Sequence, residues 1–143
     1  MNHSLTVSKS VTINASVAKV WHTLTTPALI AEYLFGTETV TDWKVGSPII
    51  FQGEYQGQKY CDKGVILEHV LHERIRYSYW SGFSGLEDKP ENYSVVTHLL
   101  RKKDDNHTEL IWTQQGFANE EAHKHYENGM DAFLASVKAA MER

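Results

Sequence analysis

The chain has 143 residues, of which 41% are hydrophobic, 22% charged and 11% aromatic, which is typical of a globular protein and excludes a low-complexity chain. Its net charge is −4 and no basic stripe is visible, so we expect no nucleic-acid partner. The single cysteine, Cys61, excludes a disulfide within the chain, and we expect it to be a small strand residue rather than a nucleophile.

Length and hydropathy also limit how the chain is organised. A chain of about 150 residues buries enough surface for a core without disulfides or metals, and we predict a single domain over residues 1–143. No apolar run reaches the roughly 20 residues that span a bilayer, and the first residues lack a signal-peptide pattern. We therefore expect no membrane span and a cytoplasmic location.

The N-terminal part of the chain predicts one strand and two short helices. Residues 5–13 alternate apolar and polar side chains, as a half-buried strand does. In residues 16–26, apolar side chains recur at i, i+3, i+4 and i+7 on one helical face, and Asn14 or Ser16 is positioned to cap that helix. Pro27 interrupts it and opens a second short helix, because proline suits the first helical turn.

The middle of the chain predicts about six antiparallel strands joined by short turns. Gln56–Gly57 lies between two extended runs and predicts a hairpin. Later strands are expected in residues 72–80, 93–102 and 107–115, which are rich in β-branched and aromatic side chains. Consecutive strands with short connections predict a meander.

The C-terminal part predicts one long helix that begins at about Asn119. Asn119 suits the N-cap, and Glu120 and Glu121 suit the positive end of the helix dipole. An antiparallel sheet with one buried face needs a cover, and this helix is the only element able to supply it. Its apolar stripe consists of Ala122, Tyr126, Met130, Phe133, Val137, Ala140 and Met141.

Several segments in this order resemble a known family. The segments INASVAKVWHTLTTPALIAEYLF, TDWKVGSPIIFQG, GVILEHVLHERIRYSYW, SVVTHLL and TELIWTQQGF, followed by the long helix, resemble the SRPBCC (START-like) superfamily over about residues 7–141. The chain looks most like the branch related to the C-terminal domain of the activator of Hsp90 ATPase. The resemblance implies an α+β helix-grip (START/Bet v 1-like) fold, in which a curved antiparallel sheet wraps around the C-terminal helix and often encloses an apolar cavity.

The resemblance brings no shared catalytic motif, and one position departs from it. The C-terminal helix of this branch usually carries Gly-Trp, whereas this chain has Gly129–Met130. A glycine inside a helix costs about 1 kcal/mol relative to alanine. Either close approach of the sheet or room for a ligand beside Met130 would offset that cost.

Aromatic and polar-tipped residues on the strands and the helix are the candidate ligand-binding residues. Ligand pockets are mostly apolar with a few placed polar groups. For the strand residues, cavity lining and ordinary packing both stay open, because a slip of one residue reverses the face. The candidates are Trp43, Phe51, Tyr77, Tyr79, His98, Trp112, Gln114, Tyr126, Met130 and Phe133.

Four titratable residues are candidates for a chemical role. If His98 faces a cavity, it is a candidate acid–base group or ligand anchor, and Glu68 has a similar status. His123 and His125 are two residues apart on a helix, where they point about 200° apart, and we expect both on a solvated face. The sequence contains no metal-ligand spacing, so no metal and no cofactor are predicted.

The leading interpretation is a binding module for a small apolar or amphipathic ligand between the sheet and the C-terminal helix. One alternative, implied by the resemblance, is a co-chaperone-like interaction with an Hsp90 partner. The other is an enzyme of the cyclase or hydrolase type that uses polar residues of the cavity, such as His98 or Glu68. Because no catalytic set can be specified, binding is favoured over catalysis.

Overall fold

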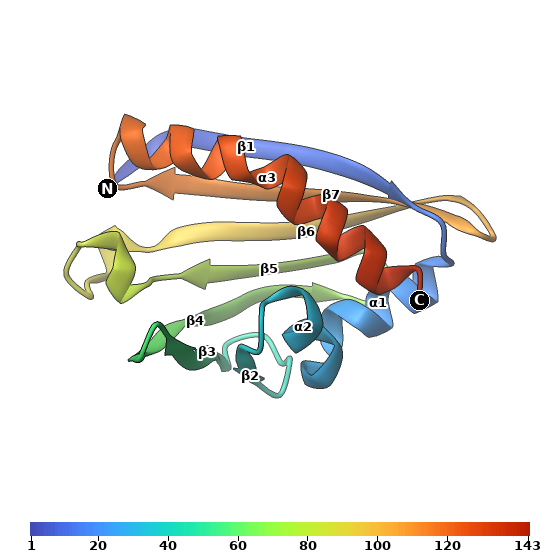
Figure 1. Cartoon of the computed structure of the whole chain (residues 1–143), viewed down its shortest axis with the longest axis horizontal. Helices are drawn as coiled ribbons and strands as arrows, with labels where there is room; N and C mark the ends of the chain where they lie inside the picture. Colours follow the sequence, from blue (N-terminus) through green and yellow to red (C-terminus); the bar gives the residue numbers. More distant parts are fainter.

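The computed structural model describes residues 1–143 and confirms the helix-grip fold, with seven antiparallel strands, two short helices and one long helix (Figure 1). The strands are β1 Asn2–Ile13, β2 Glu38–Val40, β3 Pro48–Tyr55, β4 Gln58–Val70, β5 Arg74–Tyr79, β6 Ser94–Asp104 and β7 His107–Phe117. The helices are α1 Val17–Thr25, α2 Pro27–Tyr33 and α3 Glu120–Met141, and the β5–β6 connection contains the 3-10 turns η1 Gly82–Ser84 and η2 Pro90–Asn92.

The sheet is a meander closed by the first strand. Its order is β1-β7-β6-β5-β4-β3-β2, so strands β2 to β7 follow one another as predicted and β1 lies beside β7. In that last pair, Asn2 lies opposite Phe117 and Ile13 opposite Thr108. Gln56 (φ 50°) and Gly57 (φ 80°) both have positive φ, as a two-residue hairpin between β3 and β4 requires.

Strand β4 has a close backbone contact and a bulge near its middle. A Cβ atom at Gly64 would lie 1.6 Å from the carbonyl oxygen of Ser78, so only glycine permits this approach. Just beyond it, the β4–β5 register shifts by one residue between Ile66 and Glu68. Such a bulge increases local twist and bending. The bend helps to curve the sheet toward α3.

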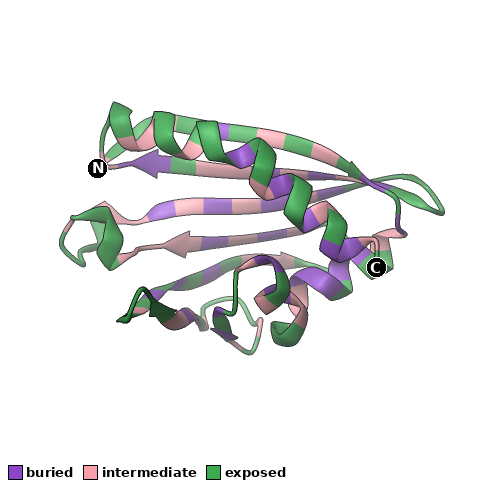
Figure 2. Cartoon of the chain, viewed as in Figure 1, coloured by how far each residue is buried: buried purple, intermediate pink, exposed green.

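Helix α3 lies across the concave face of the sheet, and its purple buried stripe in Figure 2 faces the strands. Asn119 caps its first turn by accepting a hydrogen bond from the Ala122 amide at 2.9 Å, as predicted, and Ser16 caps α1. Toward its C-terminal end, α3 buries Leu134, a residue outside the predicted stripe, together with Val137, Ala140 and Met141. No helix is both long enough and apolar enough to cross a membrane.

Candidate functional site

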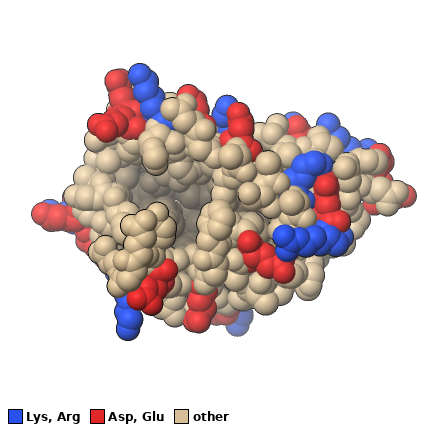
Figure 3. Space-filling view, in the orientation of Figure 1, with Lys and Arg blue, Asp and Glu red and all other residues tan.

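A cavity of about 410 Å³ lies between the concave sheet, helix α2 and the N-terminal half of α3. Figure 3 shows it as a deep hollow that opens on the face viewed. Sixteen of its 22 lining residues are hydrophobic, so its wall suits an apolar molecule. None of the 22 is a lysine or an arginine, and Asp62 is the only aspartate or glutamate among them.

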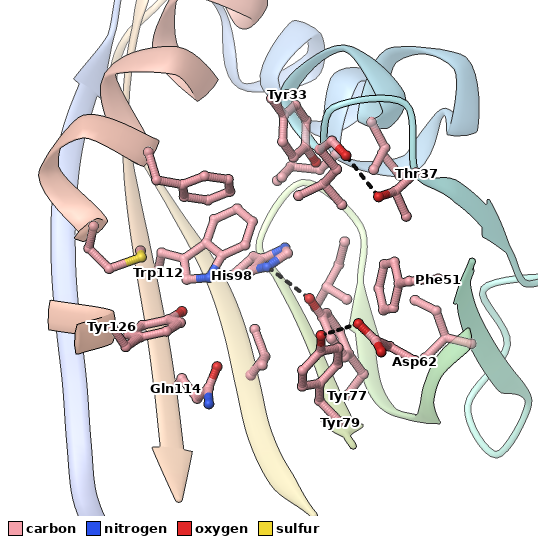
Figure 4. Close-up of a pocket in the computed structure, with 18 of the residues that line it drawn as sticks. Tyr33, Thr37, Phe51, Asp62, Tyr77, Tyr79, His98, Trp112, Gln114 and Tyr126 are labelled. Atoms are coloured by element: carbon pink, nitrogen blue, oxygen red, sulfur yellow. Dashed lines mark hydrogen bonds between the residues drawn. The ribbon is translucent and has the colours of Figure 1, made fainter. Parts of the chain in front are cut away.

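The structure places all ten candidate residues on the wall of this cavity. The loop before β3 contributes one of them, strands β3, β5, β6 and β7 contribute six, and α3 contributes three (Figure 4). That they bind a ligand stays a prediction. The ten are Trp43, Phe51, Tyr77, Tyr79, His98, Trp112, Gln114, Tyr126, Met130 and Phe133.

His98 lies on β6 between two aromatic residues of the neighbouring strands. Its ring stacks on Trp112 with centroids 3.9 Å apart, and its Nε2 lies 3.4 Å from the Tyr77 hydroxyl oxygen. Its Nδ1 is buried and has no hydrogen-bond partner. Burial lowers the pKa of His98 to about 3, so the ring is neutral at pH 7. His98 is therefore an uncharged polar group on the wall of the cavity.

Asp62 on β4 is a second polar group of the cavity, and it is absent from the predicted set. The Tyr79 hydroxyl donates to its Oδ2 at 2.6 Å, whereas its Oδ1 is buried without a partner. Only 8% of Asp62 is exposed. Because β4 alternates and Ile66 points inward four residues later, the period of two places Asp62 on the same face. This alternation along β4 is the sequence pattern that could have identified Asp62 as a residue of the cavity.

Aromatic rings surround these polar groups. Phe51 lies 5.7 Å from Tyr77 and 6.0 Å from Tyr79 between ring centroids, and Trp112 meets Phe133 edge-on at 5.2 Å. Burial raises the pKa of Tyr77 and Tyr79 well above the ordinary tyrosine value. The tyrosines therefore act as neutral hydroxyl groups at pH 7.

Helix α2 and its flanks add lining residues that sequence reasoning missed. Tyr33 of α2 is buried, meets Trp112 edge-on at 6.4 Å, and has its pKa raised by burial. The Thr37 hydroxyl donates to the Leu34 carbonyl oxygen and lies 2.5 Å from the Tyr60 hydroxyl. These residues come from a short helix, a connection and a strand, and no local sequence pattern links them.

Glu68 lies outside the cavity, in ion pairs. It contacts Arg74 and Arg76, and its hydrogen bond from Arg74 lowers the pKa of its carboxyl group. The bulge that follows Ile66 shifts the alternation of β4, so that the His69 ring, rather than the Glu68 carboxylate, faces Trp21 with centroids 5.2 Å apart.

The helix histidines occupy different places. His125 is exposed at the rim of the cavity. His123 corrects the expectation of a solvated face, because it is half-buried: its Nε2 lies 2.9 Å from the Thr6 carbonyl oxygen and its ring meets Phe117 edge-on. No three side chains of His, Cys, Asp or Glu are grouped closely enough to hold a metal ion.

Gly129 borders the cavity, whereas Cys61 lies on the surface. A Cβ atom at Gly129 would meet nothing within 4 Å, so close approach of the sheet is not the reason for this glycine, and the residue instead borders the cavity beside Met130. Cys61 is an exposed residue of β4.

A curved sheet gripping one long helix around an apolar cavity defines the SRPBCC class of proteins. Within it, the chain belongs to the family described as activator of Hsp90 ATPase homolog 1-like protein, whose profile matches residues 14–142. A solved protein from Cytophaga hutchinsonii is 39% identical, with a TM-score of 0.81, and the match covers 96% of this chain and 94% of that one.

More distant solved structures share the fold. The Aha1 dimer from Colwellia psychrerythraea is 17% identical with a TM-score of 0.73, and the match covers 96% of each chain. An Hsp90 activator from Plasmodium falciparum is 18% identical with a TM-score of 0.72, and the match covers 94% of each chain. No curated protein matches the chain significantly.

Proposed function

We propose that the protein binds a small apolar or amphipathic molecule in the cavity between the sheet and α3. The observation that carries this proposal is a cavity of about 410 Å³ with a mainly hydrophobic wall, a volume within the range of small-molecule sites. Two polar residues of the wall, His98 and Asp62, are only partly hydrogen-bonded within the protein and would orient a polar end of the ligand.

Native mass spectrometry of the protein purified from its own host tests this proposal. The expected result is a retained small molecule that adds to the mass of the folded chain and is released on unfolding. A neutral fluorescent probe, N-phenyl-1-naphthylamine, serves as the second arm and is expected to gain emission with a one-to-one stoichiometry. A bare chain that also leaves the probe unbound contradicts the proposal.

Interaction with an Hsp90 chaperone is the second candidate function, and membership of this family favours it. Two solved proteins of the same fold carry the names Aha1 and Hsp90 activator. The test is the ATPase rate of the host's Hsp90 homologue at saturating concentrations of this protein. An unchanged rate, together with no binding in a pull-down, removes this candidate without affecting the first.

The enzyme alternative retains one of its two predicted titratable groups. His98 lines the cavity, whereas Glu68 is paired with arginines outside it. The burial that keeps His98 neutral also makes it a weak base, since its pKa is lowered to about 3. We therefore favour binding over catalysis.

A further inference from the structure

Asp62 is the only aspartate, glutamate, lysine or arginine that lines the apolar cavity, which also contains two histidines, His98 and His125. Its Oδ2 accepts from Tyr79 at 2.6 Å, and its Oδ1 is buried with no partner. A buried carboxylate is costly unless a cation or several hydrogen bonds compensate it. This protein supplies one hydroxyl and no cation, and Figure 4 shows the carboxylate among the aromatic rings of the cavity.

The missing partner is not found among the neighbouring protein groups. No lysine or arginine lines the cavity. His98 stays neutral at pH 7 because burial depresses its pKa. Lys63, the residue that follows Asp62, is bound instead to Asp88 at 2.5 Å. A positive charge beside Asp62 would therefore have to come with the ligand.

The wall around Asp62 suits such a charge. Phe51 lies opposite Asp62 in the β3–β4 pair, and the Tyr79 ring stands 6.0 Å from Phe51. Aromatic faces attract ammonium groups, most strongly where water is excluded. A carboxylate adds a charge-assisted hydrogen bond, which is about twice as strong as a neutral one.

We infer that the cavity selects a ligand with a protonated amine on an apolar, ring-sized body, and that its ammonium group pairs with the Asp62 carboxylate. This inference rests on the proposed binding function and names the chemical class of its ligand. It also excludes fatty acids and other carboxylates as preferred ligands, because the cavity holds no cation to receive them and Asp62 would repel them.

Three probes of one shape test the inference by titration calorimetry at pH 7: 2-(1-naphthyl)ethylamine, 2-(1-naphthyl)ethanol and 1-naphthaleneacetic acid. The amine is expected to bind about tenfold more tightly than the alcohol, because only the amine pairs with a buried charge. The acid is expected to bind at least about tenfold more weakly than the alcohol. Equal affinities for amine and alcohol, or tightest binding of the acid, overturn the inference.

Two variants test whether Asp62 causes the preference for the amine over the alcohol. Asp62→Asn is expected to remove the amine's advantage while the alcohol's affinity stays within about threefold, and Asp105→Asn, the same change on an exposed hairpin, is the matched control. Tyr79→Phe keeps the carboxylate and serves if Asp62→Asn does not fold. It should preserve or increase the amine's advantage, and loss of that advantage in Tyr79→Phe contradicts the inference.

The outcomes separate the inference from the function on which it rests. Binding of the alcohol or the acid without preference for the amine leaves the binding function standing and removes only the ligand class. Failure of all three probes to bind the wild-type chain overturns the inference. If N-phenyl-1-naphthylamine also stays unbound and the chain purified from its host carries no small molecule, the binding function is overturned as well.

Discussion

The two halves of α3 cover different interiors. The C-terminal half buries Leu134, Val137 and Met141 in the same apolar cluster as Ile13 of β1 and Val20 of α1. The N-terminal half borders the cavity, through Gly129 and through the side chains of Tyr126, Met130 and Phe133. Protein interiors are normally close-packed. The packed end therefore supplies stability, and the other end is free to keep a space.

The largest expected effect comes from comparing two substitutions on α3, one at its packed end and one beside the cavity. Leu134 and Met130 are both buried apolar residues one turn apart, and only Met130 lines the cavity. Leu134→Ala should lower the free energy of unfolding by about 3 kcal/mol, because it leaves a new void. Met130→Ala should lower it by about half as much, since part of its surroundings is already empty. Urea denaturation measures both, and equal losses would contradict the contrast.

A pH titration of stability sharpens the same comparison through His98. Its folded pKa of about 3 lies below the unfolded value of about 6.5, so the unfolded chain binds an extra proton between these values. The stability that neutral His98 contributes to the folded state is fully present above pH 6.5. As the pH falls below that value, the free energy of unfolding decreases by about 1.4 kcal/mol per pH unit.

The His98→Phe variant should therefore show a shallower fall than the wild type between pH 6.5 and 4.5 in denaturation measurements. His125→Gln, a change at an exposed histidine, is the matched control and should keep the wild-type slope. Identical slopes for all three proteins would show that His98 does not titrate as a buried neutral group.

Filling the hollow end is the third way to test the contrast. Met130→Trp places a larger side chain there, and it reduces the space beside Gly129. Affinity for N-phenyl-1-naphthylamine should fall about tenfold or more, while stability stays unchanged or rises by about 1 kcal/mol. Fluorescence titration and urea denaturation measure the two effects. Unchanged affinity would place the ligand elsewhere.

The smallest effect is expected on the outer face. Glu68→Gln removes the ion pairs with Arg74 and Arg76, which are partly exposed and therefore weak. The Tm should fall by no more than about 3 °C, and probe affinity should stay within about twofold. A large loss of affinity in this variant would show that Glu68 takes part in ligand binding.

The sequence predicted the fold better than the site, for physical reasons that differ by residue. Asn119 and Gln56–Gly57 are local signals, because a cap and a hairpin turn depend on the residues themselves. Asp62 was missed although the alternation of its strand indicates an inward-facing side chain. Alternation predicts the face on which a residue lies, but not whether its carboxylate oxygens have hydrogen-bond partners. The partner of a polar atom is set by strands distant in sequence.

The positions of other residues depend on tertiary packing and cannot be predicted from local sequence patterns. The bulge after Ile66 changes which residues of β4 face inward, and it arises from the fit of β4 on β5. Tyr33 reaches the cavity only because α2 is placed beside α3 by the tertiary fold. His123 is half-buried because α3 crosses the β1 edge at its first turns, a docking position that helical periodicity alone does not give.

The pairing of β1 with β7 has a consequence for the timing of folding. Val7 lies opposite Gln114, so the first strand gains its partner only after more than a hundred residues have been synthesised. Chains dominated by such distant pairings fold slowly. The cavity is enclosed only when α3, the last element of the chain, packs onto the sheet. A ligand therefore meets only the completed fold, and it should slow unfolding while leaving the rate of folding unchanged.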